Sequence, residues 1–156
     1  MPKYLQDYYP DEFAHCYGCG RHNAAGLHIR TTWDGDDAVA TFRPRPEHIA
    51  VPGFVYGGLI ASLIDCHGIG AAAAAVERAE GRDIGAGPAP RFVTGSLRVD
   101  YLQPTPLGPP LHLRARARQI TAKKVIVDVS LFADGVLTAR GEVLAVRMPA
   151  SMDVRR

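Results

Sequence analysis

The 156-residue sequence predicts one domain of the α+β class, in which a curved antiparallel β-sheet wraps around one long central helix. Two observations predict this class. Residues 53–76 are apolar or small on nearly every side of a helix, and such a helix has to be enclosed rather than lie on a surface. After Arg91 the apolar pattern changes from helical to alternating, and strand-like runs follow with the short turns of an antiparallel meander.

The first half of the chain predicts a hairpin followed by this helix. The expected strands are 27–33 and 38–43, and the Asp-Gly pair between them is typical of a hairpin turn. A loop rich in proline comes next. The helix is then expected to begin at Gly57 and Gly58 and to end near Ala79, where charged residues follow the apolar run.

The second half predicts more strands, at 92–103, 111–120, 125–133 and 136–148. One enclosed helix and about six strands together predict the hotdog fold, a sheet curled around its helix. The alanine run 71–75 fits, because small side chains let a helix and a sheet approach closely. We therefore expect three regions, which are a leader with a C-x-x-C turn at 1–26, a hotdog domain at 27–148 and a flexible C-terminal tail at 149–156.

The composition indicates which kinds of partner and which cellular location to expect. The net charge of +2 is too small to argue for a nucleic-acid partner. The first residues are polar and acidic rather than a secretory signal, and three cysteines do not suggest a disulfide framework, so we expect a cytoplasmic protein. Residues 53–76 are long enough to span a bilayer, but Asp65 and His67 within them argue against a membrane partner.

Asp65 lies inside the most apolar segment, where an ionised carboxylate is costly unless something compensates for its burial. Gly57 and Gly58, at the presumed helix start, offer unpaired N–H groups that can stabilise a carbonyl oxygen as it becomes negative. Gly57 and Asp65 are separated by about 12 Å along a helix, so one carbonyl group cannot contact both in one chain. An antiparallel helix from a second copy would bring them together, and a catalytic interpretation therefore predicts a homodimer in which Asp65 is the base or the nucleophile.

Simpler interpretations of these polar residues stay open at this point. Asp65 can instead cap a kink or pair with an arginine in the core. His67 points well away from Asp65 around the helix, and we expect a buried, hydrogen-bonded structural histidine there. Cys66 is expected to be an inert core thiol.

Three segments resemble the PaaI-like acyl-CoA thioesterases, a hotdog family. The segment VYGGLIASLID at the helix start resembles the family's HGG…D segment. The upstream segment CYGCGRHNAAGLHI is similar to the family's C-x-x-C-G…N-x-x-G-L lead-in, and RVDYLQPTPLGPPLHLRARA resembles the family strand that carries Y-x-x-P-x-x-x-G. The resemblance covers roughly residues 13–148. It implies hydrolysis of an acyl-CoA thioester to a carboxylic acid and free CoA, without a cofactor, by a homodimer or a dimer of dimers.

Carried over by position, the resemblance implies roles for individual residues. Asp65 matches the family's catalytic carboxylate. Gly57, with Gly58 beside it, matches the glycine whose N–H polarises the thioester carbonyl. Thr94 matches a residue that helps to orient the attacking water. The family's histidine before Gly-Gly is Tyr56 here. Tyrosine can donate a hydrogen bond to a carbonyl or to sulfur but cannot shuttle protons at neutral pH, and it can also simply plug the helix start. This difference motivates an alternative, a non-catalytic acyl-CoA binding module, and a hotdog hydratase or dehydratase is a third hypothesis.

Two further patterns have a structural and a functional interpretation. Arg114, Arg116 and Arg118 alternate along one expected strand and share a face, which is either solvated or docks the phosphates of CoA. Cys16 and Cys19 form a C-x-x-C, for which we favour a tight turn over a zinc site or a redox pair, since zinc would need two more ligands. We therefore expect no metal in the functional site.

Overall fold

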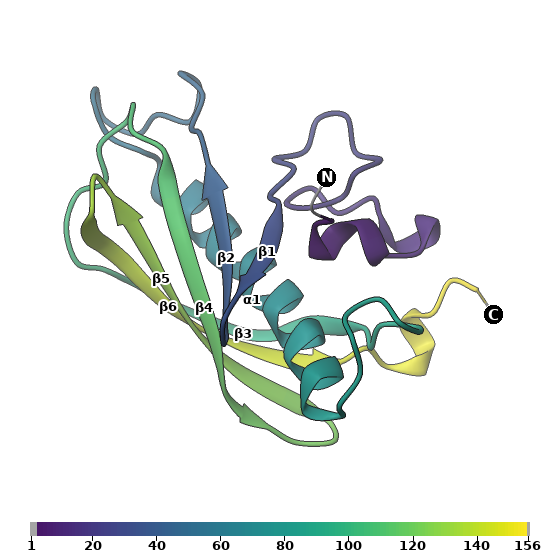
Figure 1. Cartoon of the computed structure of the whole chain (residues 1–156). Coiled ribbons are helices and arrows are strands. Elements are labelled where there is room, and N and C mark those ends of the chain that lie inside the picture. The colour runs from purple at the N-terminus through teal and green to yellow at the C-terminus, as the bar shows by residue number, and fades with distance from the viewer. Residues whose placement is uncertain (1–2, 156) are drawn as a thin grey trace.

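The computed structural model describes residues 3–155, and these form one long helix, α1 (Gly57–Ala79), on the concave side of a six-stranded sheet (Figure 1). All neighbouring strands are antiparallel, in the order β1-β2-β4-β5-β6-β3, and α1 contacts every strand. The α+β class and the hotdog fold are confirmed. The strands are β1 (Thr31–Asp34), β2 (Asp37–Phe42), β3 (Phe92–Tyr101), β4 (Leu111–Ile120), β5 (Lys124–Ala133) and β6 (Val136–Arg147).

Short 3-10 turns lie outside the sheet. Two belong to the expected leader, Leu5–Tyr8 and Asp11–Phe13, and one follows β6 at Ala150–Met152. Residues 1–2 of the expected leader and residue 156 of the expected tail lie outside the described residues.

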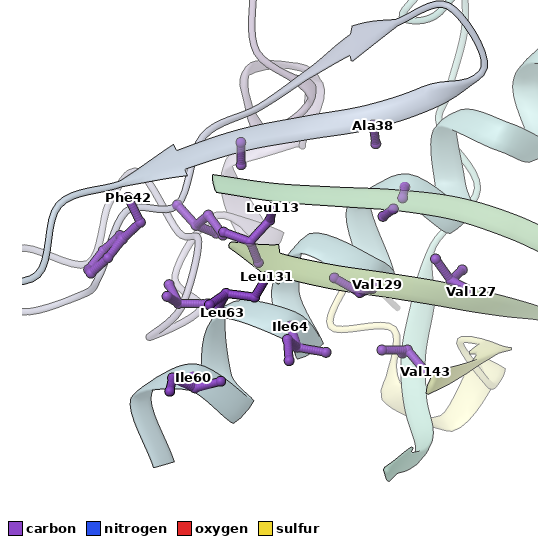
Figure 2. Close-up of a cluster of buried hydrophobic side chains, with 14 of the residues drawn as sticks. Ala38, Phe42, Ile60, Leu63, Ile64, Leu113, Val127, Val129, Leu131 and Val143 are labelled. Carbon is purple, nitrogen blue, oxygen red and sulfur yellow. The ribbon is translucent and has the colours of Figure 1, made fainter. Parts of the chain in front are cut away.

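The core forms between α1 and the inner face of the sheet. Leu63 and Ile64 of α1 point toward strand side chains that include Leu131 and Val143, and all four are fully buried (Figure 2). Alternation along the strands sends one set of side chains inward and the other set to solvent, as in the pattern of β5. Since full burial of such a side chain contributes about 1.5–3 kcal/mol, this layer is the main source of stability.

The first strand is shorter than the alternating pattern predicts. It begins at Thr31 rather than at residue 27. The preceding residues are held by the leader instead, because the N–H of Leu27 donates to the carbonyl of Tyr17 at 2.8 Å and that of Ile29 to the carbonyl of Gly18 at 3.0 Å. These residues therefore dock the C-x-x-C turn.

The other element bounds agree with the expectation to within one residue, with one exception. The strand expected at 92–103 ends at Tyr101, because the N–H groups of Leu102 and Gln103 both turn to the carbonyl of Thr138. The helix has the expected bounds, and although it is long and apolar enough to cross a bilayer, 78% of its most apolar stretch is buried inside the protein. It therefore has the surroundings of an enclosed core helix.

Small residues in α1 set its distance from the sheet, and Gly68 shows this best. A Cβ atom at Gly68 would lie 2.7 Å from Cγ2 and 3.0 Å from Cβ of Val143 in β6. A Cβ atom at Gly70 would stay 3.4 Å from its nearest neighbours, Gln6 and Tyr9. The two glycines thus differ in packing while they share the same helix.

We expect Gly68→Ala to lower the free energy of unfolding by about 1–3 kcal/mol relative to Gly70→Ala. Both substitutions gain the same helix propensity, about 1 kcal/mol, so the difference isolates the close contact of α1 with β6. Urea unfolding of the two variants, followed by circular dichroism, measures it. Equal unfolding midpoints would contradict the packing described here.

Candidate functional site

Asp65 lies half-buried on α1, and its carboxylate is oriented by a neighbouring strand. Thr94 donates a hydrogen bond from Oγ1 to Oδ1 of Asp65 at 2.6 Å. Burial raises the pKa of Asp65, the hydrogen bond from Thr94 opposes this, and the charge of Cys16 adds to the rise in pKa. Within residues 3–155 no arginine forms an ion pair with Asp65, so the carboxylate is free to interact with another molecule.

Thr94 reaches Asp65 because β3 is irregular at this point. The pairing of β3 with β6 shifts by one residue between Thr94 and Ser96. Gly95, at the shift, has no room for a side chain, since a Cβ atom there would lie 2.6 Å from Cγ2 of Val146. Bulges of this kind redirect side chains next to them, and here the redirected hydroxyl meets the carboxylate.

The start of α1 leaves backbone donors unused. Tyr56 precedes the helix in an extended conformation (φ −59°, ψ 129°), and its side chain makes no capping hydrogen bond. In the described part of the chain, no group accepts a hydrogen bond from the N–H of Gly57 or Gly58. Two N–H groups at the positive end of a 23-residue helix are suited to bind an oxygen that carries or develops negative charge.

Two tyrosines enclose this helix start. The ring of Tyr56 folds over Gly58, where a Cβ atom would lie 2.4 Å from it. Tyr101, at the end of β3, donates its hydroxyl to the carbonyl of Gly57 at 2.6 Å. The two residues are 57% and 53% exposed, so they border the helix start without sealing it. Tyr101 was not among the site residues predicted from the sequence, although the Y-x-x-P motif that it begins could have indicated it.

Strand β3 connects the two halves of the candidate site. Thr94 near its beginning contacts Asp65, and Tyr101 at its end contacts Gly57. The strand forms one edge of the sheet, so one side of its backbone has no partner strand within residues 3–155. Within one chain the structure does not bring Asp65 and Gly57 together, because they are separated by about 12 Å along the same helix.

A model of the thioesterase superfamily matches residues 52–144, more than half of the chain, and this region contains α1 and β3. The chain belongs to the thioesterase superfamily. The family resemblance expected from the sequence is thereby confirmed. The match begins just before the Gly-Gly helix start and leaves the leader with its C-x-x-C turn outside. No curated protein matches the chain.

Solved structures of superfamily members share the fold. A thioesterase superfamily protein from Shewanella loihica PV-4 is 43% identical over 90% of this chain and 100% of that chain, with a TM-score of 0.68. The E. coli PaaI protein from the phenylacetic acid degradation operon is 18% identical over 79% of this chain and 81% of that chain, with a TM-score of 0.64. Smu.793 from Streptococcus mutans UA159, solved bound to acetyl CoA, is 18% identical over 77% and 88% of the two chains, with a TM-score of 0.62.

His67 has a structural place in this superfamily member, as expected. It is fully buried, Nε2 donates to the carbonyl of Ala38 at 3.0 Å, and Nδ1 accepts from the hydroxyl of Thr31 at 2.9 Å. Gln6 completes the network through the hydroxyl and the N–H of Thr31. Burial lowers the pKa of His67 to about 4, so the ring is neutral at neutral pH and both nitrogens are occupied. His67 is therefore poorly placed for acid–base chemistry.

The three arginines of β4 share the outer face of the sheet, away from α1, as the alternation predicts. Each pairs with carboxylates, Arg114 and Arg116 with Asp37 and Arg118 with Asp128. They border an open groove of about 420 Å³. The structure does not bring them to Asp65 within one chain, since β5 and β6 separate β4 from β3. Their role in docking CoA stays a prediction.

The C-x-x-C turn packs against α1 directly beside Asp65. The sulfur atoms of Cys16, Cys19 and Cys66 all lie within 4.8 Å of one another. Cys66 was expected to be an inert core thiol, and its sulfur neighbours were not predicted because they are about 50 residues away in the sequence. No local sequence pattern predicts such a long-range contact.

Proposed function

We propose that this superfamily member is an acyl-CoA thioesterase, which hydrolyses a thioester to a carboxylic acid and free CoA. The observation that carries the proposal is one helix with two unused N–H groups at its start and a half-buried carboxylate, oriented by Thr94, further along. An acyl transfer to water needs these two devices, an oxyanion site and a base or nucleophile. The superfamily membership and the acetyl-CoA-bound neighbour support the same class of ligand.

The complete site requires a second copy of the chain, and the edge of β3 supports a way to form it. This edge has no partner strand in the described part of the chain, and it carries exposed apolar side chains, including Leu97 and Tyr101. If two β3 strands pair about a two-fold axis, they run antiparallel, and the Thr94 end of one lies beside the Tyr101 end of the other. Asp65 of one protomer would then face Gly57 of its partner. We therefore propose a homodimer, or a dimer of such dimers, with two equivalent sites.

The reaction then follows from the positions of these groups. The N–H of Gly57, with Gly58 beside it, binds the thioester carbonyl oxygen and stabilises the negative charge that develops there. Asp65 takes a proton from a water molecule that attacks the carbonyl carbon, or attacks that carbon itself before water releases the acid. The C–S bond breaks, the acyl group keeps the water oxygen, and the CoA sulfur leaves as a thiolate that gains a proton. Tyr56 and Tyr101 border the helix start, where the hydroxyl of Tyr56 can donate to the thioester carbonyl, while that of Tyr101 donates to the carbonyl of Gly57.

The test is a panel of acyl-CoAs with short, long and aromatic acyl groups, read by release of the free thiol. Turnover of at least one of them supports the proposal. Binding seen by calorimetry without thiol release would instead favour the non-catalytic binding module. That alternative is considered because Tyr56 stands where the family has a histidine. Consumption of an enoyl-CoA without thiol release would favour a hydratase, which the burial of His67 argues against.

Thr94→Val is expected to lower kcat by about 10- to 100-fold, because a hydrogen bond to a charged group contributes about 1.5–3 kcal/mol. The substitution keeps the β-branched shape and removes only the hydroxyl that orients Asp65. Thr94→Ser restores that donor, and we expect it to keep most of the activity. Steady-state kinetics of both variants separates positioning from packing, and equal losses in the two would contradict the positioning role.

A further inference from the structure

The sulfur atoms of the chain's three cysteines gather from two distant segments. Cys16 and Cys19 come from the leader turn and Cys66 from α1, and Sγ of Cys16 lies 3.6 Å from Sγ of Cys66. Two thiolates on one tetrahedral Zn²⁺, with Zn–S bonds of about 2.3 Å, are separated by about 3.8 Å. A disulfide would need a sulfur–sulfur distance of about 2 Å. The cluster therefore has the spacing of ligands that share one ion.

From this geometry we propose that Cys16, Cys19 and Cys66 bind one thiolate-preferring metal ion, of which Zn²⁺ is the representative. Thiolates select soft or borderline ions such as Zn²⁺ over Mg²⁺ or Ca²⁺. The sequence alone left a zinc site without enough ligands, and Cys66 supplies the third. This proposal replaces the expectation that the protein has no metal site.

The backbone of the turn is shaped to bring these sulfurs together. The N–H of Gly20 closes the turn on the carbonyl of Cys16 at 2.8 Å. A Cβ atom at Gly18 would lie 2.2 Å from Sγ of Cys66, and one at Gly20 would lie 2.4 Å from the backbone nitrogen of Cys16. Two glycines are thus required for the turn to lie against Cys66, and the three ligands are held in place without any ion.

The charge around the cluster suits a metal–thiolate complex. Three thiolates and one divalent ion leave a net charge of −1, and the guanidinium of Arg91 lies close enough to attract the thiolate of Cys19. The Nε atom of Arg91 is buried and has no hydrogen-bond partner among the described residues. A negatively charged complex beside Arg91 would offset the cost of burying this nitrogen.

The ion would keep one coordination position for a ligand from outside the chain. No histidine or carboxylate of residues 3–155 joins the cluster, whereas Zn²⁺ prefers four ligands. Cys16 is exposed, so water or a small thiol can reach the ion. The bound ion would fasten the leader to α1 at the residue next to Asp65. This proposal does not depend on the thioesterase activity and stands or fails separately from it.

The test uses the full chain, reduced, stripped with a chelator and titrated with Co²⁺ without oxygen. We expect one Co²⁺ per chain, with the thiolate-to-cobalt charge-transfer absorption of a sulfur site, and displacement by one Zn²⁺. Cys16→Ser, Cys19→Ser and Cys66→Ser should each weaken the affinity by more than about 100-fold. His22→Ala is the matched control, because this nearby histidine pairs with Asp11 outside the cluster, and its affinity should equal that of the wild type.

A second measurement needs no variant. Zn²⁺ should slow the alkylation of all three thiols by iodoacetamide in the wild-type chain, as counted by mass spectrometry. The proposal is overturned if the reduced chain binds less than one ion, if binding survives Cys66→Ser, or if Zn²⁺ leaves alkylation unchanged. If a serine variant loses metal binding and its circular dichroism spectrum shows that it is unfolded, the alkylation of the wild-type chain decides whether the proposal holds.

Discussion

Replacing Asp65 with asparagine is expected to lower kcat for thioester hydrolysis by about 10²- to 10⁴-fold. The amide has nearly the same size, and its oxygen can still accept the hydrogen bond from Thr94. It cannot take a proton from water or attack a carbonyl carbon, so the chemical step is lost while the fold is kept. Thiol-release kinetics measures the loss, and circular dichroism and unfolding midpoints verify the fold.

Asp134→Asn is the matched control for this experiment. Asp134 lies exposed in the β5–β6 turn with a φ of 49°, a conformation that asparagine adopts readily. We expect its activity and stability to equal those of the wild type. If Asp65→Asn hydrolyses acyl-CoA as fast as this control, the carboxylate is neither the base nor the nucleophile.

Mixing two inactive variants is expected to restore about a quarter of the wild-type activity if the site forms across a two-fold axis. One variant is Asp65→Asn and the other is Gly57→Pro, which removes the N–H assigned to the oxyanion. Proline is tolerated at the first helical residue, and the extended conformation of Tyr56 suits a following proline. Loss of one oxyanion donor costs about 10²–10³ in kcat, so each variant alone should be nearly inactive.

The quarter follows from counting sites. Random reassociation makes about half of the dimers mixed, and each mixed dimer has one site with both Asp65 and the Gly57 N–H and one site with neither. The control is the same mixture without a dissociation step, which should stay inactive. If the protomers exchange and the mixture still does not recover, Asp65 and Gly57 do not act together across the dimer.

The fold could be predicted from the sequence because its signals are local. The helix is apolar on nearly every side, so enclosure follows from residues 57–79 alone. The strands after Arg91 alternate, and short turns fix the antiparallel pairing of β4 with β5 and of β5 with β6. The expected meander was wrong for β3, which pairs with β6 at the edge of the sheet because β2 occupies the side of β4 that a meander would give to β3. The first strand was predicted too long because the residues before Thr31 alternate in the same way but bond to the leader turn. Periodicity cannot show which backbone partner a segment will have.

The candidate site was only partly predictable for the same reason. Gly57 lies at the start of an apolar helix and Asp65 is a carboxylate inside it, and these positions in the sequence were enough to predict both as site residues. The contact between Tyr101 and Gly57 joins residues 44 positions apart, and the contact between Cys16 and Cys66 joins residues 50 apart. Such contacts depend on how β3 and the leader pack against α1, and no local pattern in the sequence predicts that packing.

The buried network of Gln6, Thr31 and His67 bears on where this protein can be divided. The region that matches the superfamily starts at residue 52, which suggests a natural place to trim the chain. Trimming there would remove β1 and β2 and, with them, both hydrogen-bond partners of the imidazole, the hydroxyl of Thr31 and the carbonyl of Ala38. Each buried ring nitrogen left without a partner costs about 1–3 kcal/mol before any lost packing is counted. The recognisable domain boundary and the smallest stable folding unit are therefore different in this chain.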